Sequence, residues 1–445
     1  MSYAAAIDQL NAMTPELYAK AGQPRRKFSL DEVRILLAAL GDPERRFPAV
    51  LIAGTNGKGS TAATLASILT EAGLRTGLYT SPHLERPNER IRVGRVEIAD
   101  ADFARLFFLV LDEGDRLVRQ GWLPQMPSFF EMLTALGFLY FAESKVEIAV
   151  LEVGMGGRLD ATNVVEPLIS IMTDISLDHM EWLGPTIAAI AREKAGILRE
   201  GGTMITLPQH PEANQVLGQV AIELDVRGMS AAPYMPASEA KGPYTVEALG
   251  ATVTVDSPLK GAHQQRNVAL AIAAAVELAE RHGFPVSAAG VEEGIRRTQW
   301  PGRLERMTIA DVEWVLDVAH NPAGAWALRA GLRSILEERA PVILIFSCLS
   351  DKPVAEMAQI LFPLFERVIV APIRAVRAAA VEDLLAAARA TGTMATATES
   401  VREALQLAQE NAAGGVVVVS GSVYLVGEAR AMLVAGLPAG KSETR

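Results

Sequence analysis

The richest set of groups suited to chemistry lies in Gly54-Thr-Asn-Gly-Lys-Gly-Ser60 and in the following Thr61. The three glycines let the backbone curl so that successive N–H groups point into one concavity, and a helix starting here adds its positive dipole end. Lys58 supplies a positive charge, and Ser60 and Thr61 offer hydroxyl groups. Such groups bind the phosphates of a nucleotide and its Mg²⁺. The candidate nucleotide contacts are therefore Gly54, Thr55, Asn56, Gly57, Lys58, Gly59, Ser60 and Thr61.

The spelling of this loop differs from the usual G-x-x-x-x-G-K-[ST]. Ile52 stands where the first glycine should be, and Gly59 follows the lysine. A glycine-rich turn between a strand and a helix is common in parallel α/β proteins and needs no ligand. The lysine and the two hydroxyls at the helix start nevertheless favour phosphate binding over a bare turn.

Three further polar side chains, Ser81, Glu152 and His179, lie at or just after the ends of predicted strands. Because parallel strands end at one edge of a sheet, their hydroxyl, carboxylate and imidazole could together hold a hard cation beside the phosphate loop. Taken singly, a histidine in this position is more often a capping or packing residue. Three such groups at neighbouring strand ends favour the metal site.

Asp317-Val-Ala-His-Asn-Pro322 ends another predicted strand with an acid, an imidazole and an amide. The pattern indicates a polar site around Asp317 and His320. It also fits a plain strand-to-helix turn in which Asn321 is the N-cap and Pro322 the first helical residue.

Two other segments carry weaker signals. Gly154-Met-Gly-Gly157 has Leu159 in place of the third glycine of a dinucleotide fingerprint, so a nicotinamide cofactor is not indicated. Lys194 lies on a predicted helix, where most lysines are solvated, and periodicity alone does not single it out.

These groups need a scaffold in which strands and helices alternate. Strands are predicted at 49–53, 75–80, 146–153 and 168–173, and helices at 59–72, 100–119 and 128–143. This alternation predicts a parallel sheet flanked by helices, with functional groups at the carboxyl ends of the strands. Beyond residue 199 the pattern is less regular, with a strand at 202–206, β-like sequence at 244–256 and an alanine-rich helix at 264–282.

A domain boundary is predicted at Thr298-Gln-Trp-Pro-Gly-Arg303, which breaks the helical pattern. The alternation then restarts, with strands at 314–318, 342–346, 368–371 and 416–420. We therefore expect two domains, residues 1–298 and 299–445. The fold class is α/β: an N-terminal P-loop parallel-sheet ATPase domain and a smaller, Rossmann-like C-terminal α/β domain.

The composition fits a soluble enzyme of 445 residues, half of them hydrophobic, with a formal net charge of −10. The acidic balance argues against a nucleic-acid surface. The single cysteine, Cys348, excludes an internal disulfide and a cysteine metal cluster. The N-terminus lacks a basic-then-apolar signal, and no uninterrupted apolar run of about 18 residues occurs. We expect a cytoplasmic protein that binds neither nucleic acid nor membrane.

Taken together, these segments resemble the folylpolyglutamate synthase / dihydrofolate synthase family, a branch of the Mur-ligase-like amide-forming enzymes. The matches run in order along most of the chain. They are Gly54–Ser60, Thr80-Ser-Pro-His-Leu84, Leu151-Glu-Val-Gly-Met-Gly-Gly-Arg-Leu-Asp-Ala-Thr-Asn163, Leu177-Asp-His179, Glu193-Lys-Ala-Gly-Ile197, Pro301-Gly-Arg303, Asp317–Pro322 and Gly421-Ser-Val-Tyr424. The phosphate loop alone indicates the wider superfamily, whereas the run from Glu152 to Asn163 together with Gly421–Tyr424 is more specific.

The resemblance implies ATP binding by the N-terminal domain and ligation of L-glutamate to a folate or to dihydropteroate through an acyl phosphate. It implies two Mg²⁺ ions, for which Ser81, Glu152 and His179 resemble the ligands and Lys194 matches a lysine that the family carbamylates. Asn267 matches an adenine-side contact, and Arg303 and His320 match ATP-phosphate contacts. Asp317 matches a glutamate-binding residue, Asp160 a pterin contact of bifunctional members, and His83 a substrate-binding position. Lys58, Lys194, Asp317 and His320 are thus the candidate catalytic residues, and a monomer is expected.

Two residues depart from the family pattern: Ser347 replaces a usual glycine, and Val318 stands where many members have glycine. Three alternatives stay open from the sequence. One is an enzyme that adds glutamate to folates only, and another is a Mur-type ligase of cell-wall peptide, disfavoured by the lack of a clear N-terminal UDP-binding domain. The third, from a different class, is a P-loop phosphotransferase or regulatory NTPase, which would not need the Asp317/His320 pair.

Overall fold

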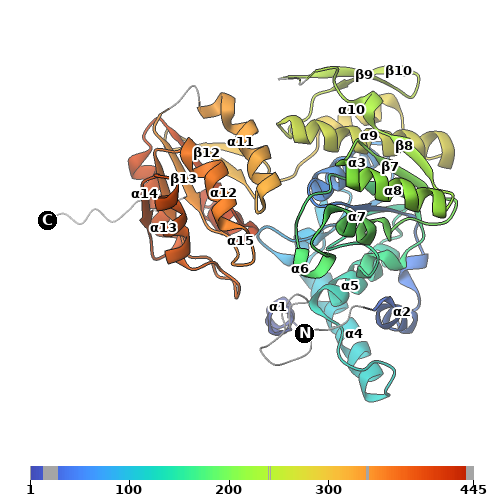
Figure 1. Cartoon of the computed structure of the whole chain (residues 1–445). Coiled ribbons are helices and arrows are strands. Elements are labelled where there is room, and N and C mark those ends of the chain that lie inside the picture. The colour runs from blue at the N-terminus through green and yellow to red at the C-terminus, as the bar shows by residue number, and fades with distance from the viewer. Residues whose placement is uncertain (1, 14–28, 239, 241, 337–339, 437–445) are drawn as a thin grey trace. The chain divides into compact units, whose positions relative to one another are not determined.

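A computed structural model of the chain describes residues 2–13, 29–238, 240, 242–336 and 340–436 (Figure 1). The chain divides into two compact units. The first comprises residues 1–83, 87–258 and 265–299, and the second comprises 84–86, 259–264 and 300–445.

The first unit is built on an eight-stranded sheet with the order β4-β3-β2-β5-β1-β6-β7-β8. Strands β2, β5, β1, β6, β7 and β8 are parallel, and β3 and β4 continue the sheet antiparallel. The strands are β1 (Ala49–Ala53), β2 (Thr76–Tyr79), β3 (Ile91–Val93), β4 (Val96–Glu97), β5 (Ile148–Glu152), β6 (Pro167–Met172), β7 (Thr203–Thr206) and β8 (Arg227–Ser230). A separate antiparallel hairpin consists of β9 (Tyr244–Ala248) and β10 (Ala251–Val255).

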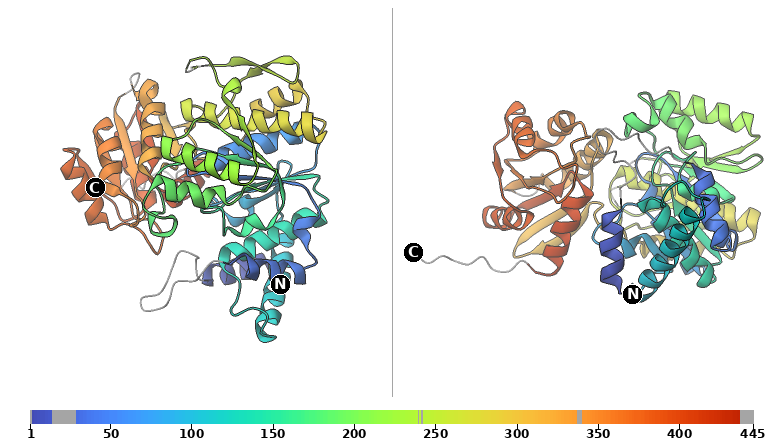
Figure 2. Two further views of the ribbon diagram at one scale, coloured as in Figure 1. Left: turned by 45° about the vertical axis from the view of Figure 1, so that its right-hand side comes forward. Right: turned by 90° about the horizontal axis from the view of Figure 1, so that it is seen from below.

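Helices cover both faces of this sheet, so its central strands are mostly apolar and buried. In β1, Ala49, Leu51 and Ala53 join one core, whereas Val50 and Ile52 join the other. The first core is shared with α1 (Tyr3–Ala12), α2 (Leu30–Ala39), α4 (Asp100–Arg119), α5 (Phe129–Glu143), α7 (Ile187–Ala195) and α8 (Pro211–Glu223). The second is shared with α3 (Lys58–Glu71), α9 (Ala262–His282), α10 (Ala288–Arg296) and the hairpin. Figures 1 and 2 show this division, with α9 and α10 in yellow and α4 and α5 in cyan.

The second unit is a six-stranded sheet with the order β11-β12-β16-β13-β14-β15, parallel except for β11. Its strands are β11 (Glu305–Ile309), β12 (Val312–Asp317), β13 (Val342–Phe346), β14 (Arg367–Val370), β15 (Ala395–Ala397) and β16 (Val416–Ser420). One core lies under α11 (Pro322–Leu336), α12 (Val354–Leu361) and α13 (Val381–Ala390), and the other under α14 (Val401–Asn411) and α15 (Val423–Val434). This arrangement again leaves the central strands buried on both faces.

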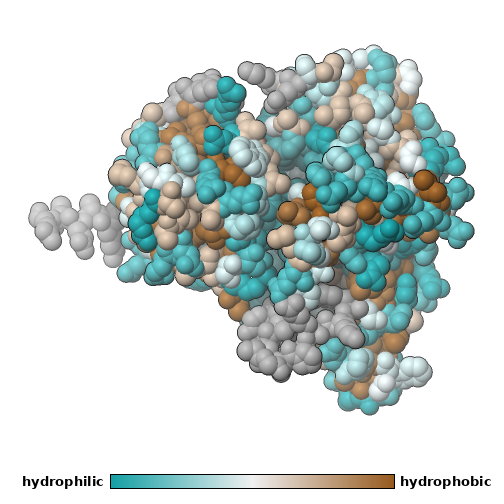
Figure 3. Space-filling model, viewed as in Figure 1, coloured by the Kyte–Doolittle hydropathy of each residue, from teal (hydrophilic) through white to brown (hydrophobic). Residues whose placement is uncertain are grey.

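The predicted α/β architecture is confirmed, and β1 has the predicted bounds. The sequence analysis did not identify β3, β4, β8, β11 or β15, which are short or lie at sheet edges, where apolar patterning is weak. No helix of the described chain is long and apolar enough to cross a membrane. On the face shown in Figure 3, hydrophilic and hydrophobic residues are interspersed over the surface of each unit.

Candidate active site

The phosphate loop connects β1 to α3, and the segment that directly follows β6 holds it in place. A Cβ on Gly54, whose φ is +154°, would lie 1.8 Å from Thr173 Oγ1, so no other residue fits there. The backbone N–H groups of Thr55 and Asn56 donate to the carbonyl oxygen of Asp174 at 2.8 and 3.2 Å. The Thr55 hydroxyl donates to Ser176 O, and the Asn56 amide donates to Ser176 Oγ. These two side chains therefore hold the loop against the segment after β6.

The start of α3 provides the groups that phosphate binding needs. The first helical hydrogen bond runs from Thr61 N–H to Gly57 O, so the preceding amides have no helical partner four residues back. Ser60 Oγ and Thr61 Oγ1 are buried and have no hydrogen-bond partner among the described residues. Lys58 Nζ donates to Gly54 O and Thr55 O, both at 3.1 Å. Because buried hydroxyls are normally hydrogen-bonded, the two unpartnered oxygens fit a bound phosphate or a hydrated cation.

Lys194 lies in the core beside this loop and not in solvent. Its side chain is buried, and Nζ donates to Gly54 O at 2.7 Å, the same carbonyl that Lys58 uses. Burial lowers the pKa of Lys194 to about 7, and the charge of Lys58 adds to this effect. The Lys194 amine is therefore partly neutral near pH 7, the form in which a lysine is a nucleophile or a metal ligand.

The glycine-rich segment 154–163 positions Lys194, a role that the sequence analysis did not assign to it. A Cβ on Gly157 would lie 2.8 Å from Lys194 O, so the segment packs directly on the end of α7. Arg158 N–H donates to Glu193 O at 2.9 Å, and the Asn163 amide donates to Gly196 O at 2.9 Å. The glycines thus serve close backbone packing.

The three proposed metal ligands have different surroundings. Glu152, the last residue of β5, is buried, and its Oε2 accepts the Ser81 N–H at 3.0 Å, so the ends of β2 and β5 are joined. His179 is half-buried with a φ of +50°, an unusual conformation for a non-glycine residue that recurs at functional sites. Asp178 lies beside it, with 4.0 Å between His179 Nε2 and Asp178 Oδ1.

The described residues contain no group of three or more His, Cys, Asp or Glu side chains arranged to hold a metal ion. The predicted set contains only two residues of these types, Glu152 and His179. The carboxylate and the Ser81 hydroxyl are oxygen donors of the kind that Mg²⁺ prefers. Lys194 fits the set only after its ammonium has lost its charge.

His83 is held by Arg90 as a neutral imidazole. Arg90 Nε donates to His83 Nδ1 at 2.9 Å, and its guanidinium lies 5.3 Å from the centre of the Phe129 ring. Burial, with a further contribution from the Arg90 charge, lowers the pKa of His83 to about 3. Because Nδ1 accepts, the proton is on Nε2, which suits His83 as a donor to a substrate.

Asp160 organises its own loop. Its buried carboxylate accepts hydrogen bonds from Met155 N–H and Thr162 N–H, both at 3.0 Å, and from the Thr162 hydroxyl at 2.5 Å. Burial raises the pKa of Asp160. Its predicted pterin contact stays a prediction, and the observed contacts are structural.

Asn267 lies against the phosphate loop, as a nucleotide contact would require. It is buried on α9, and a Cβ on Gly57 would lie 2.2 Å from its Oδ1. The preceding Arg266 forms an ion pair with Asp174, the residue that holds the loop through its carbonyl. Sequence reasoning missed Arg266, Asp174 and Ser176, because polar residues after a strand or at a helix start have no periodic signal.

In the second unit, Asp317 ends β12 and is buried. Its carboxylate oxygens accept the Leu304 and Ala319 N–H groups, both at 2.9 Å. Burial raises the pKa of Asp317, and the nearby charges of Arg303 and His263 oppose this shift. His320, which is half-buried, donates from Nδ1 to Val318 O at 3.0 Å, which leaves Nε2 as an acceptor when the ring is neutral.

The turn after β12 has the structure that the simpler interpretation predicted. Asn321 Oδ1 accepts the Gly324 N–H at 2.8 Å, and α11 begins at Pro322. This turn also places Asp317 and His320 at the carboxyl edge of the sheet. Ser347, the departure from the family pattern, has a buried hydroxyl without a partner among the described residues.

Comparison with known proteins identifies the family to which this fold belongs. The Mur ligase middle domain matches residues 130–275, and the Mur ligase glutamate ligase domain matches residues 302–423. Folylpolyglutamate synthase of Lacticaseibacillus casei is 34% identical over 98% of this chain and 100% of its own length. The dihydrofolate synthase/folylpolyglutamate synthase of Bacillus subtilis is 34% identical over 92% and 95%. The chain belongs to the folylpolyglutamate synthase / dihydrofolate synthase family.

Solved structures of the family agree with the fold. Mycobacterium tuberculosis folylpolyglutamate synthase complexed with ADP has a TM-score of 0.87 at 33% identity, covering 97% of this chain and 98% of that one. E. coli FolC in complex with DHPP and ADP has a TM-score of 0.83 at 30% identity, covering 98% of both chains. The resemblance read from the motifs is thus confirmed.

Family membership also confirms the reaction class. This member of the folylpolyglutamate synthase / dihydrofolate synthase family is an ATP-dependent acid–amino-acid ligase, and the phosphotransferase alternative is set aside. The roles of individual residues stay predictions.

Proposed function

We propose that this protein joins the amino group of L-glutamate to the carboxylate of dihydropteroate and to the γ-carboxylate of reduced folates. In the first step a substrate carboxylate oxygen attacks the γ-phosphorus of ATP, which gives an acyl phosphate and ADP. The glutamate nitrogen then attacks the acyl carbon, loses a proton and displaces inorganic phosphate, so an amide forms. An enzyme that acts on folates alone is the second candidate.

The observation that carries this proposal is the pair of buried, unpartnered hydroxyls of Ser60 and Thr61 at the start of α3, beside Lys58. A phosphate bound there would accept from both hydroxyls and from amides at the start of α3. Lys58 would offset the negative charge that repels a carboxylate from ATP. The backbone of residues 54–59 would enclose the phosphates, and Asn267 would bind on the adenine side.

Mg²⁺, held by Ser81, Glu152, His179 and a modified Lys194, would supply positive charge to the phosphates. The chemistry of Lys194 supports its modification, because a buried amine with a pKa near 7 is partly neutral. Its nitrogen can attack the carbon of CO₂ and release a proton, which turns a cation into a carboxylate-like ligand. We propose two such ions, as in the sequence-based expectation.

We assign the phosphate loop and the adenine-side contact of ATP to residues 1–298, and glutamate binding to residues 299–445. Asp317 would hold the glutamate amino group, and Arg303 and His320 would add contacts to the ATP phosphates from the second range. His83 and Asp160 would contact the second substrate, His83 through its Nε2 proton. We further propose that the protein is a cytoplasmic monomer.

The deciding experiment is incorporation of labelled glutamate with dihydropteroate and tetrahydrofolate tested in parallel. Release of ADP and phosphate should require both glutamate and one of the two acceptors. Lys58→Ala serves as the inactive control, because it removes the positive charge proposed to face the phosphates from a half-buried lysine that donates to Gly54 O and Thr55 O. ATP hydrolysis that is independent of both acceptors, without amide product, would overturn the proposal. Product with tetrahydrofolate alone would leave the folate-only enzyme.

A further inference from the structure

Arg266, near the start of α9, forms an ion pair with Asp174, the residue that holds the phosphate loop. The family motifs assign no role to Arg266. Arg266 Nε donates to both carboxylate oxygens of Asp174, at 3.1 and 3.0 Å, and Nη2 donates to Oδ1 at 2.6 Å. Nη2 also donates to Pro208 O at 3.0 Å. The guanidinium therefore connects α9, the end of β6 and the segment after β7.

Asp174 is joined to the phosphate loop through its backbone. Its carbonyl oxygen accepts the N–H groups of Thr55 and Asn56, and Asn56 and Asp174 form an isolated antiparallel bridge. Asp174 thus binds the loop through its main-chain carbonyl and Arg266 through its carboxylate. Any shift of its main chain moves Thr55 and Asn56 of the phosphate loop, whose amides it holds.

Asn267, the next residue of α9, packs directly against the same loop. Asn267 is buried with its side-chain oxygen against Gly57. Two consecutive residues of α9 therefore fix the loop at two points, Asn267 at Gly57 and Arg266 through Asp174. Because α9 is packed in the second core, a single well-packed helix supports the loop at both points.

The charge of Arg266 matters as much as its geometry. A carboxylate bonded through its own main chain to the phosphate loop would repel a nucleotide's phosphates. The guanidinium forms a charge-assisted fork on Asp174 and offsets that negative charge. The pair is partly exposed, with 28% of the Arg266 side chain and 40% of the Asp174 side chain accessible, so the effect is moderate and salt-dependent.

We propose that Arg266 is a positioning residue for nucleotide binding, which fixes Asp174 beneath the phosphate loop and neutralises its carboxylate. The inference rests on the proposed use of this loop for ATP. It predicts an effect on nucleotide affinity, and none on the binding of glutamate or on the second step of the reaction.

The test is calorimetric titration of the full-length protein with Mg·ADP, combined with steady-state kinetics. Arg266→Gln should bind ADP about fivefold more weakly and raise KM for ATP by a similar factor, as expected for loss of a partly exposed ion pair. Its kcat and KM for glutamate should stay within about twofold of the parent, by the same reasoning. The ADP affinity gap between parent and variant should shrink at high salt.

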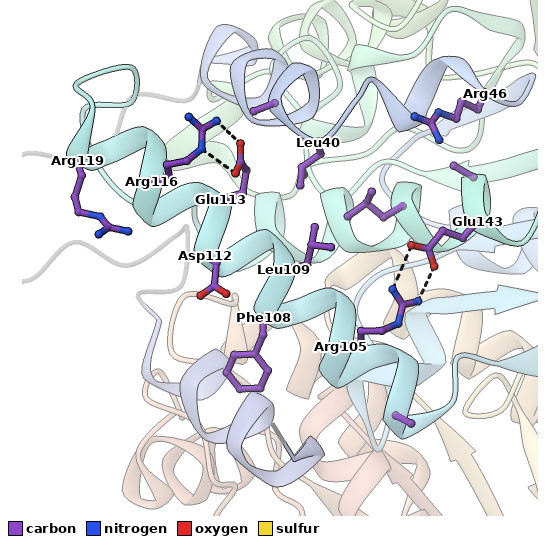
Figure 4. A pocket seen from close by; sticks show the side chains of 14 residues that line it. Leu40, Arg46, Arg105, Phe108, Leu109, Asp112, Glu113, Arg116, Arg119 and Glu143 are labelled. Carbon is purple, nitrogen blue, oxygen red and sulfur yellow. Dashed lines mark hydrogen bonds and ion pairs between the residues drawn. The ribbon is translucent and has the colours of Figure 1, made fainter.

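A second variant separates the electrostatic role from a merely structural one. Asp174→Asn in the Arg266→Gln background removes the unneutralised carboxylate, so the double variant should recover part of the lost ADP affinity. Arg105→Gln is the matched control. Arg105 is a partly exposed arginine of α4 that forms an ion pair with Glu143 at 2.6 Å beside a cavity of about 990 Å³, away from the loop (Figure 4).

The outcomes are distinct. Absence of ADP binding by the parent would refute the proposed function itself. Parent-like ADP affinity in Arg266→Gln would refute the role of Arg266 while leaving the function standing. A double variant that binds ADP no better than Arg266→Gln, or a loss of affinity in the Arg105→Gln control, would also contradict the proposal.

Discussion

Two lysine side chains donate to one carbonyl oxygen, that of Gly54, yet their surroundings differ. Lys58 is half-buried at the start of a helix, where its charge can face a phosphate. Lys194 is buried, and its pKa falls to about 7 because of burial and the neighbouring Lys58 charge. One residue type thus serves at the helix start and, when buried, as a titratable amine at the same point of the fold.

We expect Lys194 to take up CO₂. Protein incubated with ¹³C-bicarbonate should show a carbamate carbon signal by NMR, because the neutral amine is available near pH 7. Lys194→Ala should lose the signal and most activity, with partial rescue by short carboxylates. A parent protein without the carbamate signal, or a signal that persists in Lys194→Ala, would contradict this assignment.

Asp160→Asn should act on two properties. Loss of acceptor capacity towards Met155 and Thr162 should lower the free energy of unfolding by about 1–3 kcal/mol. Glutamate addition to dihydropteroate should fall more than addition to tetrahydrofolate, since the proposed pterin contact serves the former. Loop damage acts on both substrates alike, so the ratio of the two rates is the measurement, and an unchanged ratio would leave Asp160 a loop residue only.

His83 should make the folded protein less stable at acidic pH. Its pKa is about 3 in the folded protein against an ordinary 6.5, so unfolding takes up a proton between these values and stability falls as pH decreases. The contribution of His83 to the free energy of unfolding is fully present above pH 6.5. It should be smaller at pH 5.5 than at pH 8 by at most about 1.4 kcal/mol, since His83 is only half-buried. Urea unfolding of the parent and His83→Gln with EDTA at both pH values measures it. Equal pH dependence in the two proteins would refute it.

The segment 154–163 and α7 act as one element. The backbone of the segment lies so close to the end of α7 that Gly157 has no room for a side chain, and Asn163 fastens the turn after the helix. We therefore expect a substitution at Gly157 to affect Lys194 and the phosphate loop without altering a candidate ligand.

Gly157→Ala should displace the end of α7, because its Cβ would lie 2.8 Å from Lys194 O and 2.9 Å from Glu193 O. We expect a loss of about 1–3 kcal/mol in stability and a lower activity. Gly218→Ala in α8 is the control, since nothing lies within 4 Å of its Cβ and alanine favours a helix. Unfolding curves and kcat for both variants test this, and equal effects of the two substitutions would contradict it.

Besides the β9–β10 hairpin, the described chain has two large sheets, each buried on both faces, and each carries its polar candidates at the carboxyl ends of parallel strands. Our assignment of ligands to the two predicted domains follows from this division. Each ligand should then protect its own part of the chain from hydrogen exchange.

Mg·ADP should slow exchange in peptides covering residues 54–61 and 174–176, because a bound nucleotide should suppress opening of the phosphate loop and of the segment that holds it by hydrogen bonds. Saturating L-glutamate should slow exchange around residues 317–321. Hydrogen-exchange mass spectrometry of the full chain measures both effects, with the Lys58→Ala protein as the control for nucleotide. Protection by glutamate confined to residues 1–298 would overturn the assignment.

The sequence by itself determined the local features: β1, the phosphate loop, the start of α3 and the turn at Asn321, because each depends on neighbouring residues. It also identified the family, since its motifs are contiguous. The tertiary structure alone decided which distant groups meet. Burial of Lys194 on Gly54, the Arg90 contact that keeps His83 neutral, and the Arg266–Asp174 pair join residues separated by 140, 7 and 92 positions. All three depend on tertiary packing that brings these residues together, which periodicity in a sequence does not encode.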